Sequence, residues 1–169
     1  WMDEGFTEYI THLAEESVIG NPSEFPHKSS YDRYYLLVNS GLEQPQTIHS
    51  DRYDFNFAYG ATSYSKGSVF MAQLEYIIGK DNMAKTIKRY YDEFKFKHPT
   101  PNDFKRVAEK VSDMELEWYL NDWTRTANTI DYGLDVSSLS DDRSISVKRK
   151  GRMPMPLEIV VSYEDGSSL

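Results

Sequence analysis

Apolar residues recur at helical spacing from Trp1 to about Asn128. An apolar side chain every three or four positions indicates one buried face of a helix. In the first stretch this face consists of Phe6, Tyr9, Ile10, Leu13 and Ala14. In the second stretch, about Ser29–Ser40, the inward residues are expected to be Tyr31, Tyr34, Tyr35 and Val38. Leu42–Ala61 shows no period, which predicts a long loop, and long ordered loops are often functional.

Helical spacing resumes at Thr62 with a strongly apolar stripe that ends at Gly79. Asp81 is expected to cap the helix that follows. Thr100-Pro101 predicts another helix start, because a capping hydroxyl precedes a proline at the first helical position. Ser112–Glu115 resembles a capping box, which predicts a short helix whose buried face is Leu116, Tyr119, Leu120 and Trp123.

The period changes to two near Thr129, and alternation of apolar and polar residues is typical of strands. Three such runs follow, the last of them ending in an Asp-Gly turn at Asp165-Gly166. The pattern therefore predicts a mainly α protein with two parts, a helical region over 1–128 and the start of a β domain over 129–169.

Composition narrows the classes of function that remain. The chain has 169 residues and a net charge of −8, which argues against a nucleic-acid partner, because phosphate binding needs clustered Lys and Arg. No cysteine is present, which excludes disulfides, thiolate metal sites and a cysteine nucleophile. No apolar run approaches the ~20 residues that span a bilayer. The four His include no pair at a spacing of four, so no H-E-x-x-H zinc motif exists in the chain.

The opening residues Trp1-Met2-Asp3-Glu4-Gly5-Phe6-Thr7-Glu8-Tyr9 resemble a signature of the aminopeptidase-N family of zinc metallopeptidases, which includes the leukotriene hydrolase. The family's metal is held by two His of an H-E-x-x-H helix and by a Glu of this later motif. The resemblance implies that Glu4 is the third zinc ligand. The residues alone leave another interpretation open, since a Glu in a first helical turn also interacts favourably with the helix dipole.

A second motif, Tyr64-Ser65-Lys66-Gly67, resembles the family's Y-x-K-G element and lies at the family's distance from the first. The resemblance implies that Tyr64 is the catalytic tyrosine, whose phenol donates a hydrogen bond to the oxyanion. Tyr59 matches a tyrosine found five residues upstream in some members, which makes it a candidate substrate-binding residue. The alternative for either residue is a packed aromatic whose hydroxyl bonds to a backbone carbonyl.

The likeness continues through nearly the whole chain. It implies the C-terminal half of a thermolysin-like helical catalytic lobe, followed at Thr129-Ile130-Asp131-Tyr132 and Met153-Pro154-Met155-Pro156-Leu157 by the first strands of a β-sandwich. The latter elements are closest to those of bacterial cell-envelope members, which suggests an envelope or periplasmic location. The family's H-E-x-x-H motif would fall upstream of Trp1, so we expect the chain to be a fragment that lacks two zinc ligands and the general base.

The resemblance therefore implies part of a gluzincin-type hydrolase, a zinc aminopeptidase that uses one zinc ion and releases N-terminal residues from peptides. The chain by itself is expected to be inactive, and the sequence does not fix its oligomeric state. The alternative is a binding or scaffolding protein on the same fold with a lost zinc site. Glu8 and His12, one helical turn apart, could form a weak metal site or an ordinary side-chain pair.

Overall fold

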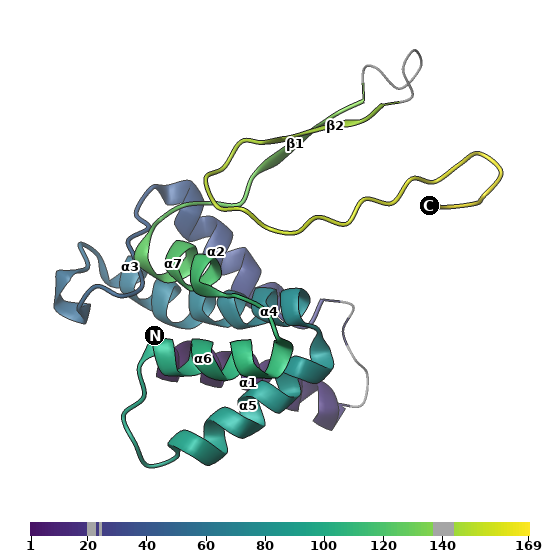
Figure 1. Cartoon of the computed structure of the whole chain (residues 1–169). Coiled ribbons are helices and arrows are strands. Elements are labelled where there is room, and N and C mark those ends of the chain that lie inside the picture. The colour runs from purple at the N-terminus through teal and green to yellow at the C-terminus, as the bar shows by residue number, and fades with distance from the viewer. Residues whose placement is uncertain (20–22, 24, 137–143) are drawn as a thin grey trace. The chain divides into compact units, whose positions relative to one another are not determined.

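The computed structural model describes residues 1–19, 23, 25–136 and 144–169 and divides the chain into two units, Trp1–Asn128 and Thr129–Leu169. The first unit is helical (Figure 1). Its elements in chain order are α1 (Met2–Ile19), α2 (Lys28–Ser40), the 3₁₀ turn η1 (Ser50–Arg52), α3 (Asn56–Gly60), the π-helical turn η2 (Ala61–Lys66), α4 (Gly67–Ile78), α5 (Lys80–Phe94), α6 (Pro101–Ser112) and α7 (Glu117–Arg125).

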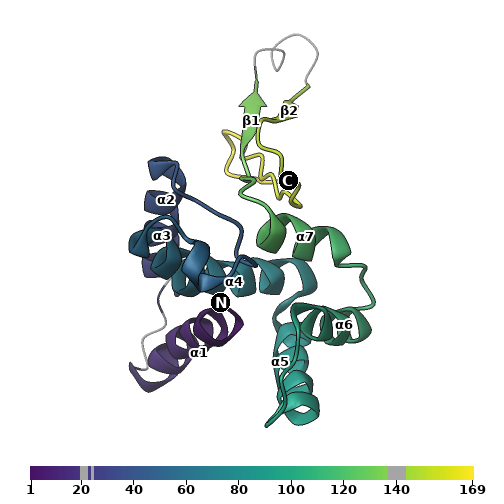
Figure 2. The same cartoon turned by 90° about the vertical axis from the view of Figure 1, so that its left-hand side faces the viewer.

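Helix α4 is the most apolar element of the first unit and lies at its centre. It packs against α1, α2 and α5, and α5 and α6 form an adjacent pair (Figure 2). Aromatic rings from different helices meet around Phe70, whose neighbours include Trp1 at 5.4 Å and Tyr119 at 5.1 Å between centroids. The core is built from large side chains that are at most 2 % exposed, among them Tyr9, Leu37, Phe70, Met71, Leu74, Phe104, Tyr119 and Trp123. Burial of such side chains is the main term that stabilises the unit.

The expected helices are present, and some of the expected faces differ. In α1 Tyr9 is buried, but Ile10 is 41 % exposed. In α2 Leu37 is fully buried while Tyr35 is 55 % exposed, so the prediction of Tyr35 as an inward residue was wrong. The expected loop of residues 42–61 is also interrupted, because η1 and α3 form within it.

The observed helix ends confirm one of the predicted helix-start signals and contradict two others. At Thr100 the predicted start is confirmed: Asp103 accepts hydrogen bonds from the Thr100 backbone N–H and hydroxyl, at 2.8 and 2.7 Å. The predicted cap at Asp81 was wrong, because α5 begins at Lys80 after Gly79. The box predicted at Ser112–Glu115 was wrong as well, because Asp113 adopts a left-handed conformation that ends α6, and α7 begins only after Leu116.

The second unit contains an antiparallel pair, β1 (Tyr132–Asp135) and β2 (Ser146–Arg149), in which Tyr132 lies opposite Arg149 and Asp135 opposite Ser146. The third alternating run forms no extended strand within the described residues. Val161 and Leu169 exchange two backbone hydrogen bonds of 3.0 Å around a turn at Gly166, whose φ is +83°. The expected Asp-Gly turn is therefore present, with a single bridge in place of a strand pair.

Candidate active site

Glu4 lies in the first turn of α1, and its side chain is partly exposed. The helix closes its first turn directly at the start of the chain, where the Gly5 N–H donates to the Trp1 carbonyl at 2.8 Å. Asp3 and Glu4 both occupy this positive end of the helix, where carboxylates interact favourably with the helix dipole. The dipole interpretation of Glu4 and its proposed use as a ligand are therefore compatible.

Tyr64 lies in η2, a π-helical turn between α3 and α4. Turns of this kind inside an α-helix are rare and occur frequently at functional sites. Of the six residues of η2, Tyr64 alone is exposed, at 40 %, and the other five are at most 3 % exposed. The local backbone thus presents one phenol on the surface of an otherwise buried turn.

Two glycines bring the two motifs together. A Cβ placed on Gly5 would lie 2.5 Å from the Gly67 Cα, and a Cβ placed on Gly67 would lie 2.7 Å from the Gly5 Cα. The backbones of α1 and α4 are therefore in direct contact at this crossing, which any side chain would prevent. Each glycine belongs to one of the motifs, next to Glu4 in the first and to Lys66 in the second. Figure 2 shows the start of α1 against the start of α4.

The crossing places the Tyr64 phenol beside the Glu4 carboxylate, although sixty positions separate the two residues. The pKa of Tyr64 is raised, first by its hydrogen bond to Glu4, then by partial desolvation and by the negative charges of Glu4 and Asp3. A phenol is protonated at neutral pH in any case, and the raised pKa extends this hydrogen-bond-donating form to higher pH. The structure therefore brings together the two residues that the sequence singled out from separate motifs.

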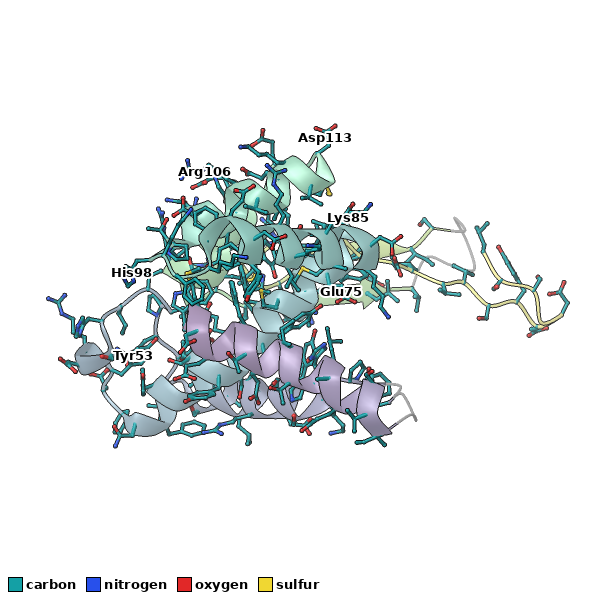
Figure 3. The ribbon with its side chains drawn as sticks, turned by 90° about the horizontal axis from the view of Figure 1, so that it is seen from below. Tyr53, Glu75, Lys85, His98, Arg106 and Asp113 are labelled. Atoms are coloured by element: carbon teal, nitrogen blue, oxygen red, sulfur yellow. The ribbon has the colours of Figure 1, made fainter. Side chains whose placement is uncertain are left out.

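Tyr59 lies on α3 at the edge of an open pocket of about 510 Å³. It is 38 % exposed, and its ring meets that of Tyr53 edge to face at 5.5 Å. Figure 3 labels Tyr53 in the loop that precedes α3. The pocket is also lined by Asp3 and Ser63, which are the sequence neighbours of Glu4 and Tyr64. Tyr59 therefore lies at the edge of a pocket that is lined by residues adjacent in sequence to Glu4 and Tyr64, and not by those two residues themselves.

One wall of this pocket comes from a segment that the sequence did not identify residue by residue. Gln46, Thr47 and Ile48 line it together with Ser50. Thr47 is fixed to the end of α7, where both its N–H and its hydroxyl donate to the Thr124 carbonyl at 3.1 Å. The absence of a period and the length of the loop were the only signals that could have pointed to this wall.

Glu4 is the one residue of the chain that the family resemblance implies as a zinc ligand. A carboxylate oxygen is a suitable zinc donor, but a catalytic zinc needs about three protein ligands. Among the residues that the structure describes, no three His, Asp or Glu side chains gather in a way that could hold a metal ion. Glu4 could therefore act as a ligand only together with groups that these residues do not provide.

His12 has partners other than a metal. Its Nε2 lies 3.8 Å from a Glu8 carboxylate oxygen and 3.2 Å from the Ser29 hydroxyl. Its Nδ1 lies 3.1 Å from Nδ1 of His27, which stacks on the Tyr9 ring at 4.9 Å. Tyr9 in turn donates to Glu75 of α4, which Figure 3 labels. This chain of contacts supports the ordinary side-chain interpretation of Glu8 and His12.

Comparison with known protein families decides the assignment. The peptidase family M1 domain matches residues 1–123, which include both motifs and the helices as far as Trp123 in α7. The chain belongs to peptidase family M1. The family resemblance inferred from Trp1–Tyr9 and Tyr64–Gly67 is thereby confirmed.

Several relatives of this M1 chain have known names. Leucine aminopeptidase 2 of Coccidioides immitis is 30 % identical over 139 residues, which cover 73 % of the chain and 21 % of the relative. Aminopeptidase N of Lactobacillus delbrueckii subsp. lactis is 20 % identical over 127 residues, 73 % of the chain and 15 % of the relative. Aminopeptidase B of Mus musculus is 27 % identical over 141 residues, 72 % of the chain and 22 % of the relative.

The M1 chain thus spans between about a seventh and just over a fifth of the length of these relatives. No solved structure matches it. In the part of the chain that the structure describes, no helix is both long and apolar enough to cross a bilayer.

Proposed function

We propose that this chain is the part of a zinc-dependent aminopeptidase that supplies one zinc ligand, Glu4, and the oxyanion donor, Tyr64. The observation that carries the proposal is the meeting of Glu4 and Tyr64 at the Gly5–Gly67 crossing. The names of the M1 relatives, all of them aminopeptidases, support the substrate class, a peptide with a free N-terminus. The lobe would be of the thermolysin-like helical kind, and residues 129–169 would begin a β-sandwich.

In this proposal each of the three candidate site residues has one task. Glu4 contributes a carboxylate oxygen to the metal site, and the remaining ligands and the general base come from residues outside this chain. Zinc, when bound, supplies Lewis-acid polarisation of the scissile carbonyl and a more acidic water. Tyr64, protonated at neutral pH like an ordinary phenol, donates a hydrogen bond to the oxygen that becomes negative as the peptide carbonyl is attacked. Tyr59 contacts the substrate from the pocket edge.

Loss of zinc from a Glu4→Gln variant tests the ligand assignment. The amide is isosteric but carries no negative charge, so we expect zinc affinity of the intact peptidase to fall by more than the ~10–100-fold that removal of an outer-shell partner causes. Bound zinc per protein is measured by atomic absorption after dialysis. The matched control is Glu8→Gln, one turn further along α1, which should retain zinc and activity. A Glu4→Gln enzyme with full zinc content would exclude Glu4 as a ligand.

The chain by itself gives a second test. Because its described residues hold no complete metal site, we expect the 169-residue chain to bind zinc weakly and to leave an aminoacyl anilide intact. The measurement is hydrolysis by the purified chain with added zinc, with and without a chelator. Chelator-sensitive hydrolysis would contradict this expectation. A folded intact protein without zinc or activity would favour the scaffolding alternative.

A further inference from the structure

Lys66 is a fully buried cation in the turn that carries Tyr64. Its side chain is 0 % exposed, and its Nζ lies 2.6 Å from a carboxylate oxygen of Glu43, whose side chain is 6 % exposed. Burial lowers the pKa of the Lys66 ammonium, and the Glu43 carboxylate opposes that shift. A buried ion pair is expensive to desolvate and is often no more stabilising than apolar residues of the same size. Its presence beside Tyr64 therefore requires an explanation other than stability.

Through its two contacts, Lys66 joins three segments that are distant in sequence. Lys66 ends η2, Glu43 lies in the loop that forms the pocket wall, and Nζ also donates to the Thr126 carbonyl just after α7 at 3.3 Å. The same loop is held to α7 at Thr47. Lys66 thus attaches η2 by polar contacts both to the loop of the pocket wall and to the segment just after α7.

Tyr64 is two residues from this attachment and faces the opposite way. Lys66 is completely buried, whereas Tyr64 is 40 % exposed beside Glu4. A π-helical turn has poorer inherent stability than an α-helical one and persists where its surroundings hold it. A displacement of ~1 Å at a catalytic group can cost about 10²-fold in rate. The position of the phenol therefore depends on what holds the buried side of the turn.

We propose that Lys66, through its ion pair with Glu43, is a positioning residue that holds η2 so that the Tyr64 phenol remains at Glu4. The catalytic meaning of this contact rests on the proposed function. The contact between Tyr64 and Glu4 does not itself rest on that function, because it is a property of this chain without zinc or substrate.

The test removes the pair and keeps its volume. The double variant Glu43→Leu/Lys66→Met replaces both charged groups by apolar ones, which leaves no unpaired charge in the interior. The readout is the nuclear Overhauser cross-peak between the Tyr64 ring and the Glu4 side chain in isotope-labelled chain, with the Tyr64 signals assigned by Tyr64→Phe. We expect the double variant to keep its thermal midpoint within a few degrees and to lose at least half of the cross-peak intensity. The matched control is Lys88→Met, which breaks an exposed pair with Asp92 of similar distance, 2.8 Å, and should leave the cross-peak unchanged.

A folded double variant with a wild-type cross-peak would overturn the proposal, because the pair would then serve the fold alone. A wild-type chain that lacks the cross-peak would overturn it too.

If the double variant does not fold, the single variant Glu43→Gln provides the test, because it keeps the size of the side chain and an acceptor oxygen. We expect amide hydrogen exchange at Tyr64–Gly67 to accelerate at least about tenfold in this variant, since local opening governs exchange. Unchanged exchange there would count against the role of the pair. Failure of the proposed function, such as full activity in Tyr64→Phe, would leave these readouts intact, so the two failures are distinguishable.

Discussion

Replacing Tyr64 by phenylalanine is expected to lower kcat of the intact peptidase by about 10²–10³-fold, the usual cost of losing one oxyanion donor. KM should change little, because the hydrogen bond strengthens only as charge develops on the substrate oxygen. The fold should be unaffected, since the phenol is 40 % exposed and lies on the surface of η2. Steady-state kinetics with an aminoacyl anilide and a thermal melt of the same preparation provide the measurement.

The control for this variant is Tyr76→Phe. Tyr76 lies on α4, is 43 % exposed and belongs to neither motif, so the same chemical change there should leave kcat as it is. A Tyr64→Phe enzyme with unchanged kcat would remove the role that we assign to the phenol. A higher KM with an unchanged kcat would instead indicate that Tyr64 binds the substrate without stabilising the transition state specifically.

Gly67→Ala is expected to destabilise the chain by about 1–3 kcal/mol, the typical cost of inserting a methyl group into packed structure. Alanine is the better helix former, so the loss would come from the crossing alone. The new Cβ would lie 2.7 Å from the Gly5 Cα and 3.3 Å from the Trp1 carbonyl oxygen, so α1 must move away from α4. The Glu4–Tyr64 contact should be lost with it. Urea unfolding followed by circular dichroism measures the free energy.

Gly60→Ala is the matched control for the crossing. Gly60 also has a helical φ of −63°, and a Cβ there would meet only the flexible tip of Arg33 at 3.4 Å. We expect equal stability or a gain of about 0.5–1 kcal/mol, because alanine restricts the unfolded chain. Equal stability of Gly67→Ala and Gly60→Ala would show that the close approach of α1 and α4 is not needed.

The helices could be predicted from the sequence because their signals are local. The Thr100-Pro101 start and the buried face of α7 needed only a few neighbouring residues. The exposure of Tyr35 and the burial of Leu37 could not be read in this way, because both suit a helix face and only the packing of α2 against η2 and α4 decides between them. The Ser112–Glu115 pattern failed for a related reason: a capping box can form only if the preceding helix has already ended.

The candidate site likewise contains residues that could be predicted from the sequence and contacts that could not. Glu4 and Tyr64 could be found because each lies in a short motif with fixed spacing. The partnership of Lys66 with Glu43 could not, because twenty-three positions separate the two residues and no short-range pattern links a loop carboxylate to a helical lysine. The pocket wall at Gln46–Ile48 depends likewise on a tertiary contact with α7.

The π-helical turn η2 (Ala61–Lys66) also limits how the sequence of this protein can change in evolution. Each residue of an α-helix rotates the chain by about 100°, and the helix from Asn56 to Ile78 is continuous on both sides of the turn. Deleting one residue from the turn would restore ordinary α-helical geometry with α3 and α4 still aligned, and it would remove the local widening from which the exposed Tyr64 side chain projects. Substitutions in this segment are therefore easier to accommodate than any change in its length, so relatives that keep both tyrosines should keep four residues between them.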